Sequence, residues 1–345
     1  MIDLLRDDAR GPLVTCLRGL LWLAQWPYIA AVSWRNRRFN RGVGVARVDV
    51  PVFSIGNITT GGTGKTPAVA WLCRFLRDHD VRVAILSRGY RADQSGVNDE
   101  ALELEQRLPD VPHLQNPDRI RSARIAVEEL ESQCLVLDDG FQHRRLHRDV
   151  DWVLVDALNP FGYGNCLPRG LLREPKLGLR RASALLVTRA NQIPPGELES
   201  LVKELRRVVG EAMPIVRTIH QCEGWRDSEG LLQPLDTWNS SRVAAFCGIG
   251  NPDAFRSTLD SQGCEVVAWR TFPDHHRYDR DDVQSLSAWV QQHDIQAVVC
   301  TAKDLVKLNA TQIGGIPVRA LQIGFEFMDD PAPLLIQIKS LLPPS

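Results

Sequence analysis

Thr59-Thr60-Gly61-Gly62-Thr63-Gly64-Lys65-Thr66 is the stretch that decides the fold of this chain. It follows a short apolar run at 52–55 and precedes a helical pattern at 68–76. A strand, a glycine-rich turn, Gly-Lys-Thr and a helix form a phosphate-binding loop, in which backbone N–H groups and the helix N-terminus face the phosphates. We predict that residues 59–66 bind a nucleoside triphosphate, although threonine replaces the usual first glycine. Lys65 reaches the β- and γ-phosphates in this prediction, and Thr66 ligates Mg²⁺.

On either side of this loop, apolar runs alternate with helical stretches. The runs lie at 52–55, 83–86, 134–137, 152–155 and 184–187, and helices are expected at 68–77 and 119–130. This alternation predicts an α/β fold with a mostly parallel sheet and helices on both faces. A second α/β series follows at 243–300. Between the two series, apolar segments at 215–221 and 231–235 flank a polar turn, which predicts a hairpin.

The composition excludes several classes of protein. Lys and Arg total 41 against 42 Asp and Glu, so no basic excess indicates a nucleic-acid partner. The eight cysteines are scattered without a C-x-x-C pair, which argues against a zinc site and against a disulfide framework. No pattern indicates an obligate protein partner.

The N-terminal region carries apolar and aromatic residues at helical spacing between Leu13 and Trp34. Its uncharged part, 19–34, falls short of the roughly 20 residues that a spanning helix needs, and Pro27 interrupts it. Arginines follow at 35, 37, 38 and 41. An apolar helix with aromatic residues and flanking arginines is typical of a helix that lies in a membrane interface. A helix that caps the core is the alternative.

The predicted organisation therefore has four parts. They are an N-terminal membrane-interface helix at 1–45, a P-loop NTPase-like kinase domain at 46–210, a β-hairpin linker at 211–236 and a second α/β domain at 237–345.

Two acidic pairs follow predicted strands. Asp138 and Asp139 end the apolar run that begins at Cys134, and an aspartate in that place binds Mg²⁺ in phosphate-loop proteins. Asp138 is the better candidate for the metal, and Asp139 for orienting another group. Asp99 precedes Glu100 at the start of an expected helix, and from the residues alone this pair is better explained as a helix cap.

Two motifs narrow the nucleotide. Thr188-Arg189-Ala190-Asn191 differs from the guanine-selecting T-K-x-D at both diagnostic residues, and an Asn side chain cannot offer two acceptor oxygens to guanine. We therefore expect ATP. Thr60 stands where partition-type ATPases carry a lysine, which weakens the interpretation as a dimerising switch.

Taken together, these motifs resemble the tetraacyldisaccharide 4′-kinases, the lipid A 4′-kinases of Gram-negative-type bacteria. The resemblance covers nearly the whole chain. The residues that carry it are Gly56 through Pro67, Ser87-Arg88-Gly89-Tyr90, Asp99-Glu100, Arg119, Asp138-Asp139-Gly140-Phe141-Gln142-His143, Leu167-Pro168 through Arg173-Glu174-Pro175, Phe272-Pro273-Asp274-His275 and Thr301-Ala302-Lys303-Asp304.

The resemblance implies ATP- and Mg²⁺-dependent phosphorylation of the 4′-hydroxyl of a tetraacyl glucosamine disaccharide 1-phosphate. It implies a monotopic protein on the cytoplasmic face of the bacterial inner membrane. It assigns the base to Asp99, supported by His275 from the second domain, and this reverses the capping interpretation of Asp99. Lys65 completes the predicted catalytic group. The residues expected to bind substrate or to support the site are Asp139, Gln142, His143, Arg119, Arg173 and Asp274.

The sequence departs from the family pattern at 98, 101 and 302, and between 168 and 172, where contacts to lipid or sugar are expected to differ. Two other classes remain open at this point: a nucleotide-switched binding protein with a phosphate loop, and a soluble kinase of small molecules.

Overall fold

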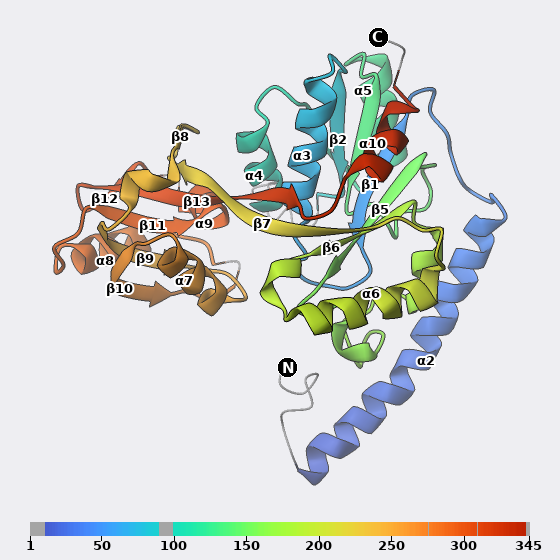
Figure 1. Cartoon of the computed structure of the whole chain (residues 1–345), viewed down its shortest axis with the longest axis horizontal. Helices are drawn as coiled ribbons and strands as arrows, with labels where there is room; N and C mark the ends of the chain where they lie inside the picture. The colour runs from blue at the N-terminus through green and yellow to red at the C-terminus, as the bar shows by residue number, and fades with distance from the viewer. Residues whose placement is uncertain (1–10, 90–98, 275, 309, 343–345) are drawn as a thin grey trace. The chain divides into compact units, whose positions relative to one another are not determined.

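The structure is a computed structural model of the chain, and it describes residues 11–89, 99–274, 276–308 and 310–342. The chain divides into two compact units. Unit 1 comprises Met1–Arg88, Asp110–His220 and Phe325–Ser345, and unit 2 comprises Gly89–Pro109 and Gln221–Gly324. Each unit contains both strands and helices (Figure 1).

Unit 1 is built on a parallel sheet whose strands lie in the order β6-β5-β1-β4-β2-β3. Every neighbouring pair in this order is parallel. The strands are β1 (Val52–Asn57), β2 (Val83–Ser87), β3 (His113–Gln115), β4 (Cys134–Asp138), β5 (Val150–Asp156) and β6 (Ala184–Thr188). The helices are α2 (Pro12–Asn40), α3 (Lys65–Arg77), α5 (Arg119–Glu128), α6 (Pro195–Val209) and α10 (Ala332–Lys339), with 3₁₀ turns η1 (Gly162–Gly164), η2 (Lys176–Arg181) and η3 (Ala190–Gln192).

The central strands of unit 1 are buried along their whole length because helices cover both faces of the sheet. On one face, Ala123 of α5 packs with Leu135 and Leu137 of β4, and Leu201 of α6 packs with Val153 of β5. On the other face, Trp152 contacts Trp71 of α3, and α10 contributes Gln337, which accepts a hydrogen bond from Trp152.

The first described helix, α2, is a single helix of 29 residues, and its N-terminal half extends away from the rest of unit 1 (Figure 1). It continues through Pro27, which the sequence predicted as an interruption. Proline removes one N–H donor, and the remaining backbone hydrogen bonds of a long helix keep it intact. Within the described ranges, no helix combines the length and the apolar character needed to cross a bilayer.

Unit 2 has a sheet in the order β10-β9-β11-β13-β7. Its strands are β9 (Arg242–Cys247), β10 (Glu265–Thr271) and β11 (Ala297–Thr301), together with most of β13 (Ile316–Phe327) and the second half of β7 (Ile215–Arg226). The first half of β7 and the last three residues of β13 belong to unit 1, where residues 215–217 pair parallel with β6. The strands β8 (Leu232–Gln233) and β12 (Gln312–Ile313) pair antiparallel with β7 and β13. The remaining elements are α4 (Asp99–Arg107), α7 (Pro252–Ser261), α8 (Arg280–Val290), α9 (Ala302–Leu308) and the 3₁₀ turn η4 (Leu235–Trp238).

The predicted α/β fold with mostly parallel sheets is confirmed, and the predicted hairpin is present as the β7–β8 pair. The units are not contiguous in sequence, whereas the predicted domains 46–210 and 237–345 are. Residues 89–109 group with unit 2, where Glu100 of α4 lies 3.5 Å from the Lys303 Nζ of α9. The segment from Phe325 onward returns to unit 1.

Candidate phosphate-binding site

The phosphate loop joins the end of β1 at Asn57 to the start of α3 at Lys65. Gly64 is the N-cap of α3 and has φ 83°, a left-handed conformation that glycine adopts without strain. A Cβ on Gly64 would also collide with the ring of His220. The first turn of α3 contains no acidic residue, so its N-terminal N–H groups and partial positive charge are available to an anion.

Neighbouring segments hold this loop in place. The Thr60 N–H donates to the Leu171 carbonyl at 2.8 Å, and the Arg173 N–H donates to the Ile58 carbonyl at 2.8 Å. From the other side, the buried Thr188 hydroxyl donates to the Thr63 carbonyl at 3.0 Å. These bonds fix the loop backbone before any ligand arrives, which is the preorganisation that phosphate binding requires.

The loop residues also fit a nucleotide with Mg²⁺. Lys65 and Thr66 are only 8% and 7% exposed, and the buried Thr63 hydroxyl has no hydrogen-bond partner within the described part of the chain. Asp138 ends β4 opposite Ile55 of β1, so its carboxylate follows the strand next to the loop. Among the described residues, no cluster of three or more His, Cys, Asp or Glu could hold a metal. Mg²⁺ usually binds through one or two protein groups, phosphate oxygens and water.

Asp139 connects the loop to two arginines. It lies in the left-handed region with φ 51°, accepts from Arg173 Nη1 at 2.8 and 2.9 Å, and lies 3.8 Å from Lys65 Nζ. Burial on its own would raise the pKa of this carboxyl. Lys65, Arg173 and Arg119 more than offset that effect and hold its pKa below the usual range. Asp139 is therefore ionised at neutral pH, and its carboxylate pairs with the Lys65 ammonium.

Arg119, the first residue of α5, is almost fully buried. Its Nη2 donates to the Asp138 carbonyl at 3.0 Å and its Nη1 to the Asp139 carbonyl at 3.4 Å. Burial lowers the pKa of this guanidinium, and the carboxylates of Asp139 and Asp138 oppose that shift. In this structure Arg119 braces the backbone turn that carries the two aspartates.

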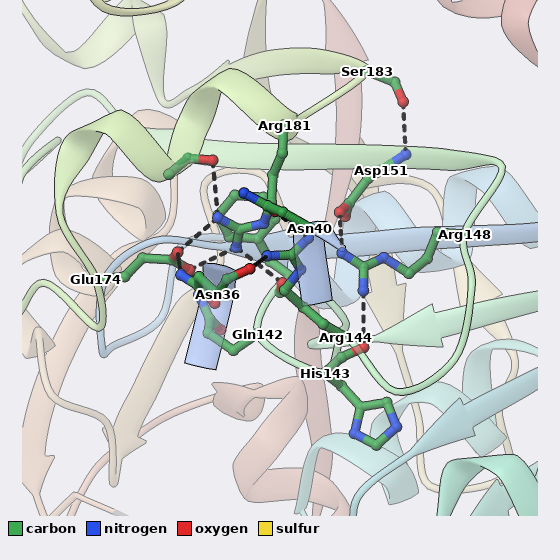
Figure 2. Close-up of polar contacts among 12 residues, drawn as sticks. Asn36, Asn40, Gln142, His143, Arg144, Arg148, Asp151, Glu174, Arg181 and Ser183 are labelled. Atoms are coloured by element: carbon green, nitrogen blue, oxygen red, sulfur yellow. Dashed lines mark hydrogen bonds and ion pairs between the residues drawn. The ribbon is translucent and has the colours of Figure 1, made fainter. Parts of the chain in front are cut away.

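Gln142 and His143 occupy different environments. The Gln142 Nε2 donates to the Asn57 carbonyl at 2.8 Å and to Glu174 Oε1 at 3.1 Å, so Gln142 braces the end of β1. Burial, followed by repulsion from Arg119, Arg148 and Arg145, lowers the pKa of His143 to about 4. Its imidazole is thus neutral at pH 7, and it is turned away from Glu174 (Figure 2).

Sequence reasoning missed the role of Glu174. This carboxylate is 1% exposed and accepts from Arg181 at 2.6 and 2.7 Å, from Gln142 and from Asn36 at 3.0 Å (Figure 2). A buried carboxylate needs such donors. The motif Arg173-Glu174-Pro175 carried the family resemblance, but a glutamate between an arginine and a proline gives no sign of burial.

The motif Thr188–Asn191, considered above only for base selection, borders the loop. Arg189 has φ 55° and its Nη2 donates to the Gly62 carbonyl at 3.3 Å. Its Nε donates to Asp156 Oδ1 at 2.9 Å. Asp156 ends β5 and Arg189 follows β6, the adjacent parallel strand, and the sequence did not predict their ion pair.

The remaining predicted site residues belong to unit 2. Asp99 begins α4, but its side chain lies outside the described residues, as does His275. Asp274, which precedes His275 in the sequence, is exposed. Tyr278, three residues after His275 in the sequence, donates its hydroxyl at 2.9 Å to the fully buried Asp304. Asp304 also accepts from Thr301 Oγ1 at 2.6 Å and from the Gly248 N–H at 3.1 Å.

Comparison with known proteins gives one consistent family. Residues 17–342 match the family model described as tetraacyldisaccharide-1-P 4′-kinase. The chain is 41% identical over 320 residues to the tetraacyldisaccharide 4′-kinase of Anaeromyxobacter sp. (strain K), covering 87% of this chain and 84% of that protein. It is 33% identical to the protein of the same name from Geobacter sulfurreducens, covering 96% of each.

Among solved structures, the chain resembles the kinase of Aquifex aeolicus crystallised in complex with ATP. The two superpose with a TM-score of 0.76 at 28% identity, over 94% of this chain and 99% of that one.

Proposed function

Because this chain belongs to the tetraacyldisaccharide-1-P 4′-kinase family, we propose a division of the kinase reaction among its residues. The enzyme transfers the γ-phosphoryl group of ATP to the 4′-hydroxyl of the disaccharide lipid, a step of lipid A biosynthesis. The observation that supports the assignment is the chain of contacts from Arg173 through Asp139 to Lys65 at the N-terminus of α3.

We assign the donor half of the reaction to unit 1. The N–H groups of residues 59–66 and the Lys65 ammonium bind the β- and γ-phosphates. Thr66 and Asp138 hold Mg²⁺, which supplies charge neutralisation on the phosphate oxygens when it is bound. Asp139, ionised and bound to Arg173, keeps the Lys65 ammonium directed along the loop.

We assign the acceptor half to Asp99 and His275. The Asp99 carboxylate accepts the proton of the 4′-hydroxyl while the hydroxyl oxygen attacks the γ-phosphorus. The bond between the γ-phosphorus and the β–γ bridging oxygen breaks, and ADP is released. His275 orients that carboxylate. The family resemblance motivates both roles. The role of Asp99 also suits the chemistry, since phosphoryl transfer to an alcohol requires a base such as a carboxylate.

Membrane association is also proposed, through α2. Its large apolar side chains are unusually exposed for a folded protein: Leu13 is 85%, Leu20 58%, Leu23 59% and Trp34 67% exposed. Arg37 and Arg38 lie in its last turn. Exposed leucine and tryptophan with flanking arginines suit a lipid surface with anionic headgroups, as expected for the cytoplasmic face of the inner membrane.

The test is phosphorylation of a tetraacyl disaccharide 1-phosphate with labelled ATP by the purified protein. Wild-type enzyme should label the lipid. Asp99→Ala should lower kcat by about 10²- to 10⁴-fold, the usual contribution of a general base, while ATP binding persists. Turnover by Asp99→Ala close to that of wild type would remove Asp99 from the mechanism. ATP-driven dimerisation without lipid labelling would favour a nucleotide switch instead.

A further inference from the structure

The helix α2 has an inner face as well as an exposed one. Its inner side chains recur at helical spacing: Gln25, Tyr28, Val32 and Asn36. Three of them bind the segment 166–174, which runs beside the phosphate loop. Gln25 Oε1 accepts from the Cys166 N–H at 3.2 Å, the Tyr28 hydroxyl donates to the Arg173 carbonyl at 2.7 Å, and Asn36 Nδ2 donates to Glu174 Oε2 at 3.0 Å.

These contacts reach two consecutive residues of the site. Tyr28 holds the backbone of Arg173, and Asn36 holds the side chain of Glu174. The Glu174 carboxylate has donors from three elements, since Asn36 comes from α2, Arg181 from η2 and Gln142 from the turn after β4 (Figure 2). A buried carboxylate that loses one donor retains the desolvation penalty, so each donor helps to fix its position.

From Glu174 the contacts continue to the phosphate loop. Gln142, which donates to Glu174, also donates to the Asn57 carbonyl at the end of β1. The Gln142 Oε1 accepts from Arg173 Nη1 at 3.2 Å, and the same Nη1 binds Asp139, which faces Lys65. An unbroken series of polar contacts therefore runs from α2 to the lysine of the loop.

We propose that Asn36 and Tyr28 of α2 are positioning residues for phosphoryl transfer. The helix that carries the exposed apolar face also sets the geometry of Arg173, Asp139 and Lys65. This inference rests on the function proposed above, in which Lys65 neutralises charge on the transferring group. A displacement of Glu174 and Arg173 would be passed to Asp139 and then to Lys65, and it would be felt most in the transition state.

The experiment compares three variants of the full-length protein in detergent without vesicles. Asn36→Asp keeps the shape of the side chain but replaces the donor with a second carboxylate against buried Glu174. Tyr28→Phe removes one hydroxyl and keeps the ring. Asn40→Ala is the matched control, because Asn40 lies one turn further along α2 and its side chain accepts from Arg144 instead. For each variant, kcat, KM for both substrates, the melting temperature and the Kd of ATP–Mg²⁺ are measured.

We expect kcat to fall about tenfold or more in Asn36→Asp and about two- to fivefold in Tyr28→Phe, the range expected for hydrogen bonds to charged and neutral groups. The Kd of ATP–Mg²⁺ should rise several-fold in Asn36→Asp, with KM for the lipid within twofold of wild type. Asn40→Ala should match wild type in all of these. A purely structural role would lower the melting temperature or the fraction that binds nucleotide, and it would leave kcat per binding-competent molecule unchanged.

The inference is overturned if Tyr28→Phe and Asn36→Asp both keep wild-type kcat and nucleotide affinity per folded molecule. If Asn36→Asp does not fold, Tyr28→Phe and Asn36→Ala decide by the same criterion. If wild-type protein binds ATP–Mg²⁺ but phosphorylates no lipid, the proposed function fails, and nucleotide affinity alone still tests the positioning role.

Discussion

At the residue scale, the surroundings of each titratable side chain in the site set its protonation state. Asp139 is kept ionised by the cations around it, whereas His143, four residues further on, is kept neutral by burial and nearby arginines. The two side chains follow the same strand, so their different protonation comes from what packs against each of them.

The depressed pKa of His143 predicts a specific pH dependence of stability. Its folded-state pKa of about 4 lies below the ordinary value of 6.5, so between these values the unfolded chain binds the proton and the folded chain does not. The free energy of unfolding should therefore fall as the pH is lowered from about 6.5 to about 4, with a contribution on the order of 1–3 kcal/mol from this histidine, allowing for partial solvent screening.

Urea unfolding at pH 7, 6 and 5 tests this expectation, with His143→Asn compared to wild type. The substitution changes stability at every pH, so the slope is the informative quantity. The variant should lose less stability on acidification than wild type does. Equal slopes in the two proteins would mean that His143 titrates normally in the folded state.

Single residues also show the limit of sequence reasoning about the site. The order of Gly64, Lys65 and Thr66 was enough to predict the phosphate loop, because that local pattern carries the chemistry itself. The sequence could not assign roles to Glu174 and Arg189, because their hydrogen-bond partners lie far away in the sequence. The partners of Glu174 are 7 to 138 residues away, and those of Arg189 are 33 to 127 residues away. No spacing in the sequence reports such contacts.

At the scale of elements, α2 is unusual because it exposes large apolar side chains on one side and binds unit 1 on the other. The sequence predicted an apolar helix with aromatic residues and flanking arginines in this region, and its placement in a membrane interface stays a prediction. It did not predict that the helix runs unbroken through Pro27, nor that Tyr28 and Asn36 contact the site.

Removing apolar surface from α2 should weaken membrane binding. Leu20→Glu with Leu23→Glu places two carboxylates on its exposed face, and each lost leucine forfeits on the order of 1.5–3 kcal/mol of burial in lipid. The affinity of the protein for vesicles of anionic phospholipid, measured by co-sedimentation, should therefore drop more than tenfold. Ile336→Glu on α10 is the matched control, since Ile336 is 68% exposed but lies on another helix. Equal loss of binding in both variants, or in neither, contradicts α2 as the docking element.

At the scale of the whole molecule, the chain passes between the units four times, after Arg88, Pro109, His220 and Gly324. The alternation of strands and helices was readable because each strand is a buried apolar run. The sequence did not predict that residues 89–109 group with unit 2. That grouping depends on a contact between α4 and α9, and such a contact produces no periodic pattern in the sequence. The return of α10 to unit 1 was missed for the same reason.

The packing of α10 predicts where unit 1 is vulnerable. Leu334 and Ile338 are fully buried, whereas Ile336 on the same helix is mostly exposed. Leu334→Ala should destabilise the protein by about 2–5 kcal/mol, the usual cost of a large-to-small change in a core, and Ile336→Ala by less than about 0.5 kcal/mol. Chemical denaturation followed by tryptophan fluorescence measures both. A similar small loss in the two variants would show that α10 adds nothing to the core of unit 1.

The position of α10 also bears on how the enzyme is made. Gln337 bridges the Trp152 indole and the Ser183 carbonyl, at 2.9 Å each, so it closes the core around strands synthesised far earlier. On the ribosome, the phosphate loop emerges early, but the helix that completes its domain emerges only after all of unit 2. During translation the core of unit 1 therefore lacks α10 while about 110 further residues, from Gln221 to Asp330, are synthesised. A nascent chain with an exposed apolar α2 and an unfinished core is a natural client for chaperones until that last helix arrives.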